Sequence, residues 1–427
     1  MTFVADLHLH SRFSMATSRA LTIPHLAGWA LRKGIDVLGT GDFTHPGWRQ
    51  ELKASLKEDR ESGLYTSILP PELPCPVPDR AGPLFCLQTE ISCIYKRGGK
   101  TRKVHNLIFM PDFNAAEKFS KRMELIGNLT SDGRPILRLD SHDLFEIALD
   151  CSPRAVLIPA HVWTPWYALF GSKSGFDDIR DCYGDLTRHI FALETGLSSD
   201  PPMNRLLSSL DNYALISNSD AHSGPNLGRE ANLFSGNPSY DGIFDALRAA
   251  SRREDPPSGS CRFLGTLEFY PEEGKYHLDG HRACNIALVP AQTRELNNIC
   301  PVCGKPLTVG VLHRVTELAD REIAPCLEKE PETRMLVPLP EVVGQILAAR
   351  PGSRKVETAC SRIVTELGAE LDVLCQLPLD QIRAFSETLG EAVSRIRQKT
   401  IQLDAGFDGQ YGKISIFQPG ELTTPSL

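Results

Sequence analysis

The 427-residue chain lacks several features that would place it in a membrane or secreted class. It has no run of 18 or more apolar residues, which excludes a conventional membrane-spanning helix. Its N-terminus also lacks the basic stretch and apolar stretch of a secretory leader. Positive charge is not in excess either, because 46 Lys and Arg stand against 53 Asp and Glu. We therefore expect a cytoplasmic protein that does not bind membranes and meets polyanions only through local patches.

Cysteine occurs twelve times, but its distribution does not indicate a disulfide framework. Only Cys300 and Cys303 form a close pair, whereas small secreted domains carry many closely spaced cysteines. The length exceeds that of one ordinary domain, and 41% hydrophobic with 23% charged residues is typical of globular proteins. We expect a monomer of two or three domains with reduced thiols and a metal site at the close pair.

The first 255 residues alternate short apolar runs with amphipathic stretches. Strand and helix in strict turn imply parallel βαβ units, and this many units predict an α/β fold with a closed or nearly closed barrel. In such barrels the chemistry lies at the C-terminal ends of the strands. The predicted strands are 3–9, 37–39, 84–92, 104–110, 155–160, 190–194 and 214–218, and the predicted helices are 23–33, 115–126, 141–150 and 202–210.

Composition divides the rest of the chain. The proline-rich stretch 69–83 indicates a loop inserted in the barrel, and the charged, Pro-, Ser- and Gly-rich stretch 252–260 indicates a domain boundary. Short strand-like runs and the paired cysteines follow, and helical patterns then dominate from 335 to 404. The predicted domains are a metallohydrolase barrel (1–255), a zinc-binding module (256–330) and a helical C-terminal region that binds DNA (331–427).

The N-terminal segment VADLHLH places Asp6, His8 and His10 at alternate positions. Side chains two apart on a strand share a face, so this segment would present two imidazoles to one ligand. The same spacing recurs in SNSDAHSG, which carries Asp220 and His222. A lone histidine at a strand end is more often a hydrogen-bonded structural residue than a ligand, so the rest of the chain must supply matching ligands.

Polar residues follow nearly every predicted strand. At the end of a barrel these residues would form a ring. If they were only packed together, many buried polar groups would lack hydrogen-bond partners, whereas a metal cluster accounts for the whole set. Mixed imidazole and carboxylate ligands suit Zn, Mn or Fe, and ions held in pairs assist phosphoester hydrolysis, although amide and amine hydrolysis use similar ligands. The residues are His8, His10, Asp42, His45, Glu90, His105, His161, Glu194, Asp220 and His222.

DLHLH, Glu90, His161 and SDAH together resemble the motifs of the polymerase and histidinol phosphatase (PHP) family. The resemblance implies a distorted (βα)7 barrel with two or three Zn, Mn or Mg ions and Glu90 as the bridge between ions. Where the family has Thr-Asp-His this chain has Gly41-Asp42-Phe43, so Asp42 and His45 are added as candidate ligands. Glu194 is a ligand, a general base or a substrate-positioning residue. The ligands that the resemblance implies are His8, His10, Glu90, His105, His161, Asp220 and His222.

A second metal site is predicted after the barrel. His281 and Cys284 form one pair, and Cys300 and Cys303 form another after fifteen intervening residues. Two such pairs close a tetrahedron around zinc, with His277 as the alternative histidine. Four protein ligands leave no open position, so this single zinc is expected to be structural.

Across nearly the whole chain, EGKYHLDGHRACN, CPVCGKPLTVGVLHRVTELADR and GFDGQYGKISIF resemble the endonuclease Q family. The resemblance implies a repair endonuclease that recognises uracil, hypoxanthine, xanthine and abasic sites in double-stranded DNA and cleaves 5′ of the lesion. Asp220 and Glu194 are its expected catalytic residues, and a sliding clamp or other repair proteins are candidate partners. A small-molecule phosphoesterase and a non-catalytic DNA-binding module are the alternatives. The expected DNA contacts are Trp163, Trp166, Arg314, Arg350, Arg354 and Lys355.

Overall fold

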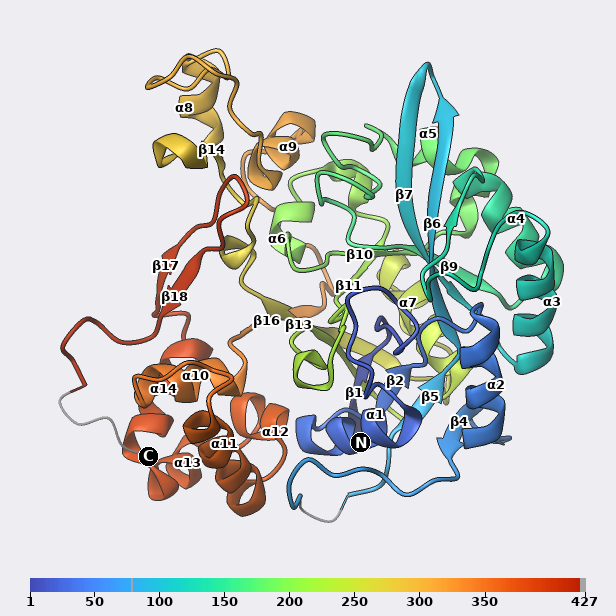
Figure 1. Ribbon diagram of the computed structural model, residues 1–427, viewed down its shortest axis with the longest axis horizontal. Coiled ribbons are helices and arrows are strands. Elements are labelled where there is room, and N and C mark those ends of the chain that lie inside the picture. The colour runs from blue at the N-terminus through green and yellow to red at the C-terminus, as the bar shows by residue number, and fades with distance from the viewer. Residues whose placement is uncertain (78–79, 423–427) are drawn as a thin grey trace.

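The computed structural model describes residues 1–77 and 80–422. Pro78 and Asp79 of the predicted proline-rich loop, and residues 423–427 of the predicted C-terminal region, lie outside the described residues. Figure 1 shows a large α/β body, a lobe that carries α8, β14 and α9, and a cluster of helices near the C-terminus. Within the described ranges, no helix is long and apolar enough to cross a membrane.

The main sheet has eight strands in the order β16-β13-β12-β1-β2-β5-β4-β3. β1, β2 and β5 are parallel, as predicted, whereas β12 lies antiparallel to both β1 and β13. β3 and β4 form an antiparallel hairpin, which a short connection permits where a parallel pair needs a long crossover. The strands are β1 (Thr2–Asp6), β2 (Val37–Gly39), β3 (Leu56–Asp59), β4 (Leu64–Ser67), β5 (Leu84–Cys86), β12 (Ala231–Ser235), β13 (Arg262–Phe269) and β16 (Glu332–Leu336).

The remaining strands of the body form two smaller sheets. One has the order β8-β6-β7-β9, and the other pairs β10 with β11 in parallel. β6 and β7 form a long antiparallel hairpin that turns at Gly98 and Gly99, both with positive φ (60° and 74°). The expectation of strict parallel alternation is therefore wrong here, although the mixed α/β class is confirmed. The strands are β6 (Gln88–Arg97), β7 (Lys100–Phe109), β8 (Ile136–Leu137), β9 (Val156–Pro159), β10 (Ala192–Glu194) and β11 (Ala214–Ile216).

The helices of the body begin and end where local chemistry directs. Thr22 caps α1 by accepting a hydrogen bond from the backbone N–H of His25, and Gly34 ends the helix in the left-handed conformation (φ 90°). Phe3, Ala5 and Leu7 pack in a core cluster with α7, and Val4 and Leu9 in one with α1, so β1 is buried on both faces. The helices are α1 (Ile23–Lys33), α2 (Pro46–Ser55), α3 (Phe113–Glu124), α4 (Ser141–Cys151), α5 (Ile179–Tyr183), α6 (Pro201–Asn204) and α7 (Tyr240–Arg252).

The region predicted as the zinc-binding module divides between two parts of the structure. β13 falls within 256–330 but pairs with β12, so the main sheet extends past the predicted boundary at 255. The lobe proper contains the hairpin of β14 (Asp279–His281) and β15 (Ile286–Leu288), followed by α8 (Pro290–Glu295) and α9 (Val311–Leu318). This lobe also contacts the C-terminal part of the chain, because Leu278 forms an isolated β-bridge with Phe407.

The C-terminal region is helical, as predicted. The helical stretch predicted from 335 to 404 is divided at Gly368 (φ 123°) and again at Ser386, which caps α14. Figure 1 shows the hairpin of β17 and β18 between these helices and the lobe that carries α8, β14 and α9. The elements are α10 (Leu339–Ile346), α11 (Arg354–Leu367), α12 (Glu370–Cys375), α13 (Leu379–Phe385), α14 (Glu387–Arg397), β17 (Gln402–Asp404) and β18 (Lys413–Ser415).

A buried ion-pair network joins the C-terminal helices to the body. Arg32 Nε donates to Glu370 Oε1 at 3.0 Å, and Lys33 Nζ donates to Glu370 Oε2 at 2.7 Å. Arg32 also pairs with Glu357 of α11. Since Arg32 is fully buried and Glu370 is 2% exposed, neither charge has water as an alternative partner.

Replacing Glu370 with alanine should destabilise this junction because it leaves two buried cations without their shared carboxylate. We expect a loss of about 3 kcal/mol in the free energy of unfolding, measured by urea denaturation. Glu366→Ala is the matched control, because Glu366 is half-exposed and, among the described residues, forms an ion pair only with Arg362 on its own helix, an interaction worth about 0.5 kcal/mol. Equal losses in the two variants would contradict this account of the junction.

Candidate metal centre

The segment that contains His8 and His10 lies beside the segment that contains Asp220 and His222. Leu9 and Ala221 form a β-bridge, and the backbone N–H of His10 donates to the carbonyl of Ala221 at 3.0 Å. Asp6 fixes the second segment to β1, because its carboxylate accepts from the N–H groups of Ser219 and Gly228. Leu9 and Ala221 are 212 positions apart in the sequence, yet the two motifs meet at one strand end.

One group of potential ligands consists of His8, His10, Glu90 and Asp220, whose ligand atoms all lie within 4.8 Å of one another. His10 Nε2 is 3.1 Å from both Glu90 Oε2 and Asp220 Oδ1, and His8 Nε2 is 3.6 Å from the same two oxygens. Both Nε2 atoms and Asp220 Oδ1 are buried and form no hydrogen bond with the described residues. Buried polar atoms without partners are costly, so this convergence fits a bound cation.

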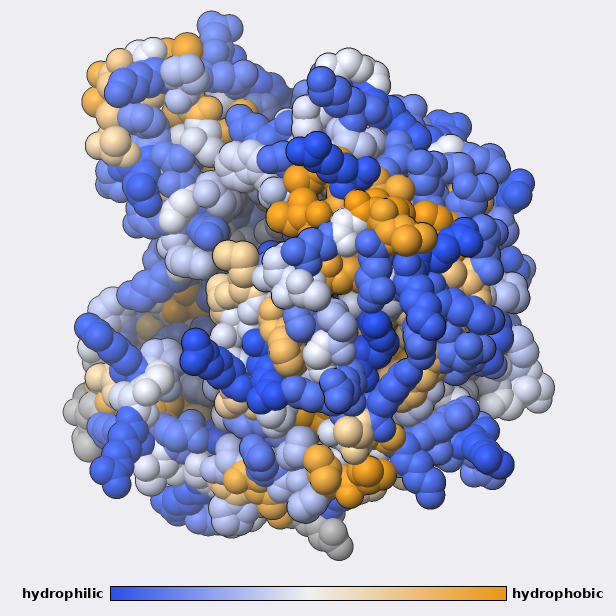
Figure 2. All heavy atoms as spheres, turned by 45° about the vertical axis from the view of Figure 1, so that its right-hand side comes forward, coloured by the Kyte–Doolittle hydropathy of each residue, from blue (hydrophilic) through white to orange (hydrophobic). Residues whose placement is uncertain are grey.

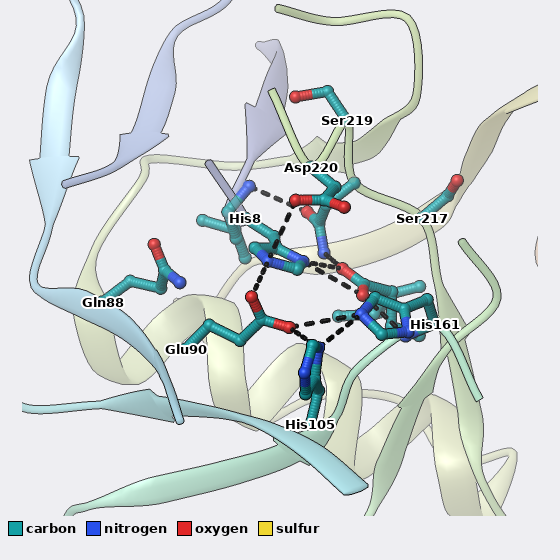
Figure 3. A network of polar contacts seen from close by, with 12 residues as sticks. His8, Gln88, Glu90, His105, His161, Ser217, Ser219 and Asp220 are labelled. Atoms are coloured by element: carbon teal, nitrogen blue, oxygen red, sulfur yellow. Dashed lines mark hydrogen bonds and ion pairs between the residues drawn. The ribbon is translucent and has the colours of Figure 1, made fainter. Parts of the chain in front are cut away.

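A second group shares Glu90 with the first (Figure 3). Glu90 Oε1 is 2.6 Å from His105 Nδ1 and 3.2 Å from His161 Nε2, while Oε2 is the oxygen that faces His8 and His10. The two oxygens of one fully buried carboxylate thus address two sets of imidazoles. This is the arrangement by which a carboxylate bridges two metal ions.

Carboxylates also contact the Nδ1 atoms of His8 and His10, on the side of each ring away from the ligand group. His8 Nδ1 lies 3.0 Å from Glu194 Oε1, and His10 Nδ1 lies 3.0 Å from Asp42 Oδ1. Glu194 also accepts from the N–H of His161 and from Asn218 Nδ2, both at 2.8 Å. A carboxylate on one ring nitrogen fixes the tautomer and aims the other nitrogen at a metal. Glu194 and Asp42 thus hold positions of this orienting kind.

The structure places the other predicted ligands outside both groups. Asp42 is occupied by hydrogen bonds from Ser11 and Ser14 besides His10, and Phe43 is buried against Phe119. His45 caps α2 by accepting from the N–H of Trp48 at 3.3 Å. His222 lies at the rim, with its ring 4.6 Å from that of His10 and its Nδ1 2.9 Å from the carbonyl of Asp220.

Electrostatics favour ionised carboxylates within this cluster. Burial alone would raise the pKa of Asp220, but the imidazoles of His8 and His10 hold it well below its usual range. Burial opposes ionisation of Glu90 in the same way, but His105 and Arg134 keep its pKa well below the ordinary value. Burial opposes the charged form of His105 as well and lowers the pKa of this imidazole to about 4.

Backbone strain gathers at the same strand ends. Asp42, His161 and Asp220 all have positive φ, at 48°, 30° and 46°. A residue with a Cβ pays of order 1–3 kcal/mol for this conformation, which persists only where the surroundings enforce it. Ten other non-glycine residues among the described ones also have positive φ, so these three conformations accompany the ligand geometry and do not identify the site by themselves.

An open cavity of about 300 Å³ adjoins the second ligand group. Arg134 was not among the predicted site residues, yet its Nη1 lies 3.3 Å from Glu90 Oε2 and its side chain lines the cavity. It belongs to a loop without a periodic pattern, so no sequence signal marks it. The lining residues are His105, Arg134, His161, Thr164, Trp166, Tyr167, Glu194, Gly196, Leu197, Ser198 and Asp220.

The residues predicted to contact DNA have different environments. Trp166 is 43% exposed at the cavity mouth, whereas Trp163 is 1% exposed and donates its Nε1–H to Asn204, so it cannot stack on a base here. Arg314 is also buried, and it donates to the carbonyls of Phe170 and Phe176 and pairs with Asp177, which makes it a brace for that loop. Exposed positions near the start of α11 are held by Arg350, Arg354 and Lys355.

The lobe that carries α8, β14 and α9, termed here the zinc lobe after its predicted ligands, brings together the four residues predicted to bind zinc. Ligand atoms of His281, Cys284, Cys300 and Cys303 lie within 4.8 Å of one another, and Cys303 Sγ is 3.6 Å from His281 Nδ1. His277, the alternative histidine, is buried outside this group. A compact set of three thiols and one imidazole has the donor chemistry of a structural zinc site.

Two buried carboxylates lie behind the metal ligands. Glu268 accepts from the hydroxyls of Thr195 and Ser217 at 3.2 Å and 3.1 Å. Burial raises the pKa of Glu268 to about 8, and burial together with the neighbouring Glu268 raises that of Glu230 well above its ordinary value. The folded protein thus retains a proton on Glu268 at a pH where the unfolded chain has lost it.

Because the folded-state pKa of Glu268 is raised, its stabilising contribution is complete below pH 4.5 and disappears as the pH rises through about 8. Glu268→Gln keeps the acceptor oxygen but cannot ionise. We expect the wild type to lose about 3 kcal/mol of stability relative to this variant between pH 5 and pH 9. Urea denaturation at both pH values measures the difference, and exposed Glu322→Gln is the control. Parallel pH profiles for the wild type and Glu268→Gln would contradict the assignment.

Comparisons with known proteins bear on the whole chain. Residues 338–400 match the model of the MJ0043 C-terminal domain family. The chain is 29% identical over 264 residues to the uncharacterized protein MJ0043 of Methanocaldococcus jannaschii, a match that covers 61% of this chain but only 32% of that protein. It is 28% identical over 434 residues to the uncharacterized protein YqxK of Bacillus subtilis, covering 96% of this chain and 98% of that one.

Two solved structures resemble this one along nearly their full length. The first is the lesion-specific endonuclease PfuEndoQ from Pyrococcus furiosus, with a TM-score of 0.83, 30% identity, and coverage of 97% of this chain and 95% of that chain. The second is endonuclease Q in complex with a 27-mer duplex that has an abasic lesion at the active site. Its TM-score is 0.82, its identity is 30%, and coverage is 99% of this chain and 98% of that chain.

Proposed function

Because the chain belongs to the endonuclease Q family, we propose that it is a metal-dependent DNA repair endonuclease that cleaves a duplex strand on the 5′ side of a damaged nucleotide. The observation that carries the proposal is Glu90, which joins two groups of buried ligands beside an open cavity. The substrates proposed are duplexes with an abasic site or with uracil, hypoxanthine or xanthine. Weak or absent pairing makes such nucleotides easier to extrude than normal ones.

The chain's own residues have separable tasks in this proposal. His8, His10, Glu90 and Asp220 would hold one ion, and Glu90, His105 and His161 another. Divalent ions at such a site acidify water and stabilise the charged oxygens of a phosphodiester under attack. Glu194 and Asp42 keep the imidazoles aimed into the site through their Nδ1 atoms.

The cavity supplies groups for the substrate itself. Arg134 places a guanidinium at its wall, where it can donate to a non-bridging phosphate oxygen. Trp166 and Tyr167 lie at the same opening, and the exposed face of Trp166 offers an apolar surface to an unstacked base or sugar.

We further propose that the eight-, four- and two-stranded sheets together correspond to the distorted PHP barrel. The zinc lobe and the C-terminal helices then form two DNA-gripping units on one side of it. Figure 2 supports this arrangement, because the surface is hollowed between these two lobes. The same view shows a largely hydrophilic face with apolar residues in separate patches.

Asp220→Asn should abolish strand cleavage while leaving the fold and much of the lesion binding intact, because the amide keeps the shape but loses the charge that a cation needs. We expect nicking of a duplex with one abasic site to fall by at least about 100-fold, measured on a denaturing gel with Mn or Mg present. The control is Asp380→Asn, whose side chain is 97% exposed. If the Asp220→Asn variant nicked the duplex at the wild-type rate, the proposed site would be contradicted.

Cys303→Ser should remove one zinc ion per chain, because it replaces one thiolate ligand of the tetrahedral group. Metal content measured by atomic emission after gel filtration is expected to fall by about one zinc relative to the wild type. Cys326→Ser is the control, since Cys326 is exposed and belongs to no ligand group among the described residues. Unchanged zinc content in Cys303→Ser would contradict the structural zinc site.

A further inference from the structure

The tip of the β6–β7 hairpin concentrates positive charge in a chain whose net charge is −7. The segment KRGGKTRK, residues 96–103, contains five cationic residues and no acidic one. Figure 1 shows the hairpin extending well beyond the helices of the body, so its tip meets solvent. A charge run of this kind is commonly a solvated face, and the environments of the individual cations decide whether it is more.

The two arginines of the tip are engaged within the protein. Arg97 pairs with Asp140 at 2.9 Å and donates to the carbonyls of Asp181 and Cys182. Arg102 lies over the ring of Phe176 at 4.1 Å and donates to the carbonyl of Gly175. These contacts attach the hairpin to the 175–182 segment, so the tip is held in a defined position.

The lysines, by contrast, form no ion pair within the described part of the chain. Lys96, Lys100 and Lys103 on the hairpin, and Lys173 on the facing loop, form no ion pair with any carboxylate in residues 1–77 and 80–422. Lys100, Arg102 and Lys173 line one polar hollow of about 250 Å³ together with Ser172 and Ser174. Lys100 and Lys173 thus place two ammonium groups beside hydroxyl donors in this hollow, and Asp177 and Glu317 line it as well. Ammonium and hydroxyl donors suit an anion with several oxygens.

The same hairpin carries two of the metal ligands. The register pairs Ser92 with His105, Ile94 with Lys103 and Lys96 with Thr101, so Lys96 and Lys103 lie on the face that bears Glu90 and His105. Lys103 also lies over the ring of Tyr167 at 5.1 Å, and that ring packs 4.8 Å from His105 at the cavity. Lys96 and Lys103 therefore extend outward from the metal centre on one face of the hairpin, whereas Lys100, which pairs with Arg97, lies on the other face beside the turn.

We propose that Lys96, Lys100, Lys103 and Lys173, termed here the lysine rail, bind backbone phosphates of one arm of the duplex. This inference rests on the proposed function and adds to it the position of the DNA. Six strand residues from Glu90 to Lys96 span ~20 Å at ~3.3 Å each. DNA advances ~3.4 Å per base pair, so the rail contacts phosphates up to about six base pairs from the cleaved bond.

The test removes three charges of the rail and compares DNA arms of different length. Lys96→Gln, Lys100→Gln and Lys173→Gln are combined, and the control combines Lys57→Gln, Lys118→Gln and Lys121→Gln at exposed positions on β3 and α3. All proteins also carry Asp220→Asn, so that bound DNA stays intact. The probes are duplexes with one abasic site and arms of 12 and 12, 12 and 3, or 3 and 12 base pairs, with affinity measured by fluorescence anisotropy.

We expect the control to bind the long duplex tightly and to lose affinity when one particular arm is shortened. The rail variant should bind the long duplex about 10-fold more weakly at 0.1 M salt, with a salt slope smaller by about 2 to 3, and should not respond to shortening that arm. Two results would overturn the proposal. One is equal affinity of the rail variant and the control for the long duplex, and the other is the same loss of affinity in both proteins when that arm is shortened.

The proposed function has a separate readout. Proteins without Asp220→Asn are tested for nicking of the same abasic duplex. Wild-type protein that binds DNA through the rail but never nicks it would contradict the endonuclease and leave the rail supported. Nicking by the wild type together with unchanged arm dependence in the rail variant would contradict the rail alone.

Discussion

The arrangement of this site depends on the carboxylate of Glu90. One of its oxygens faces His8 and His10, and the other faces His105 and His161. An isolated carboxylate with no exposure would be expensive to keep ionised, and only surrounding positive charge can compensate. The Nε2 atoms of His8 and His10 face this carboxylate, are buried, and form no hydrogen bond with the described residues. Both observations follow if cations complete the cluster.

The residues around Glu90 come from distant parts of the chain, which the fold brings together. The segment after β1 brings two histidines and β6 brings Glu90, while the strained turns after β9 and β11 bring His161 and Asp220. Behind them Glu194 and Asp42 fix ring orientation, and Asp6 fixes the Asp220 segment to β1. A substitution in this outer layer would therefore disturb the ligands without touching a metal. The strain at three strand ends is consistent with a scaffold that imposes ligand geometry rather than following local preference.

Much of this could be predicted from the sequence because the signals are periodic or strictly spaced. Alternation in DLHLH and SDAH indicated shared strand faces, and the Thr22 cap with Gly34 explains why α1 has the predicted bounds. Asp42 and His45 were harder, since type and spacing do not tell a ligand from a residue that orients a ligand or caps a helix. Arg134 could not be found, because its role arises only where its loop meets Glu90. Likewise the antiparallel strands and the buried Trp163 depend on tertiary packing, which overrides local pattern.

The central claim is that Glu90 joins two metal ions at the strand ends. Anomalous X-ray scattering from crystals grown with Mn and Zn tests it most directly, because it locates each ion independently of activity. The account predicts one peak between Glu90, His8, His10 and Asp220, and another between Glu90, His105 and His161, besides the peak at the cysteine cluster of the zinc lobe. Occupied zinc at the cysteines with no peak on either side of Glu90 would contradict it.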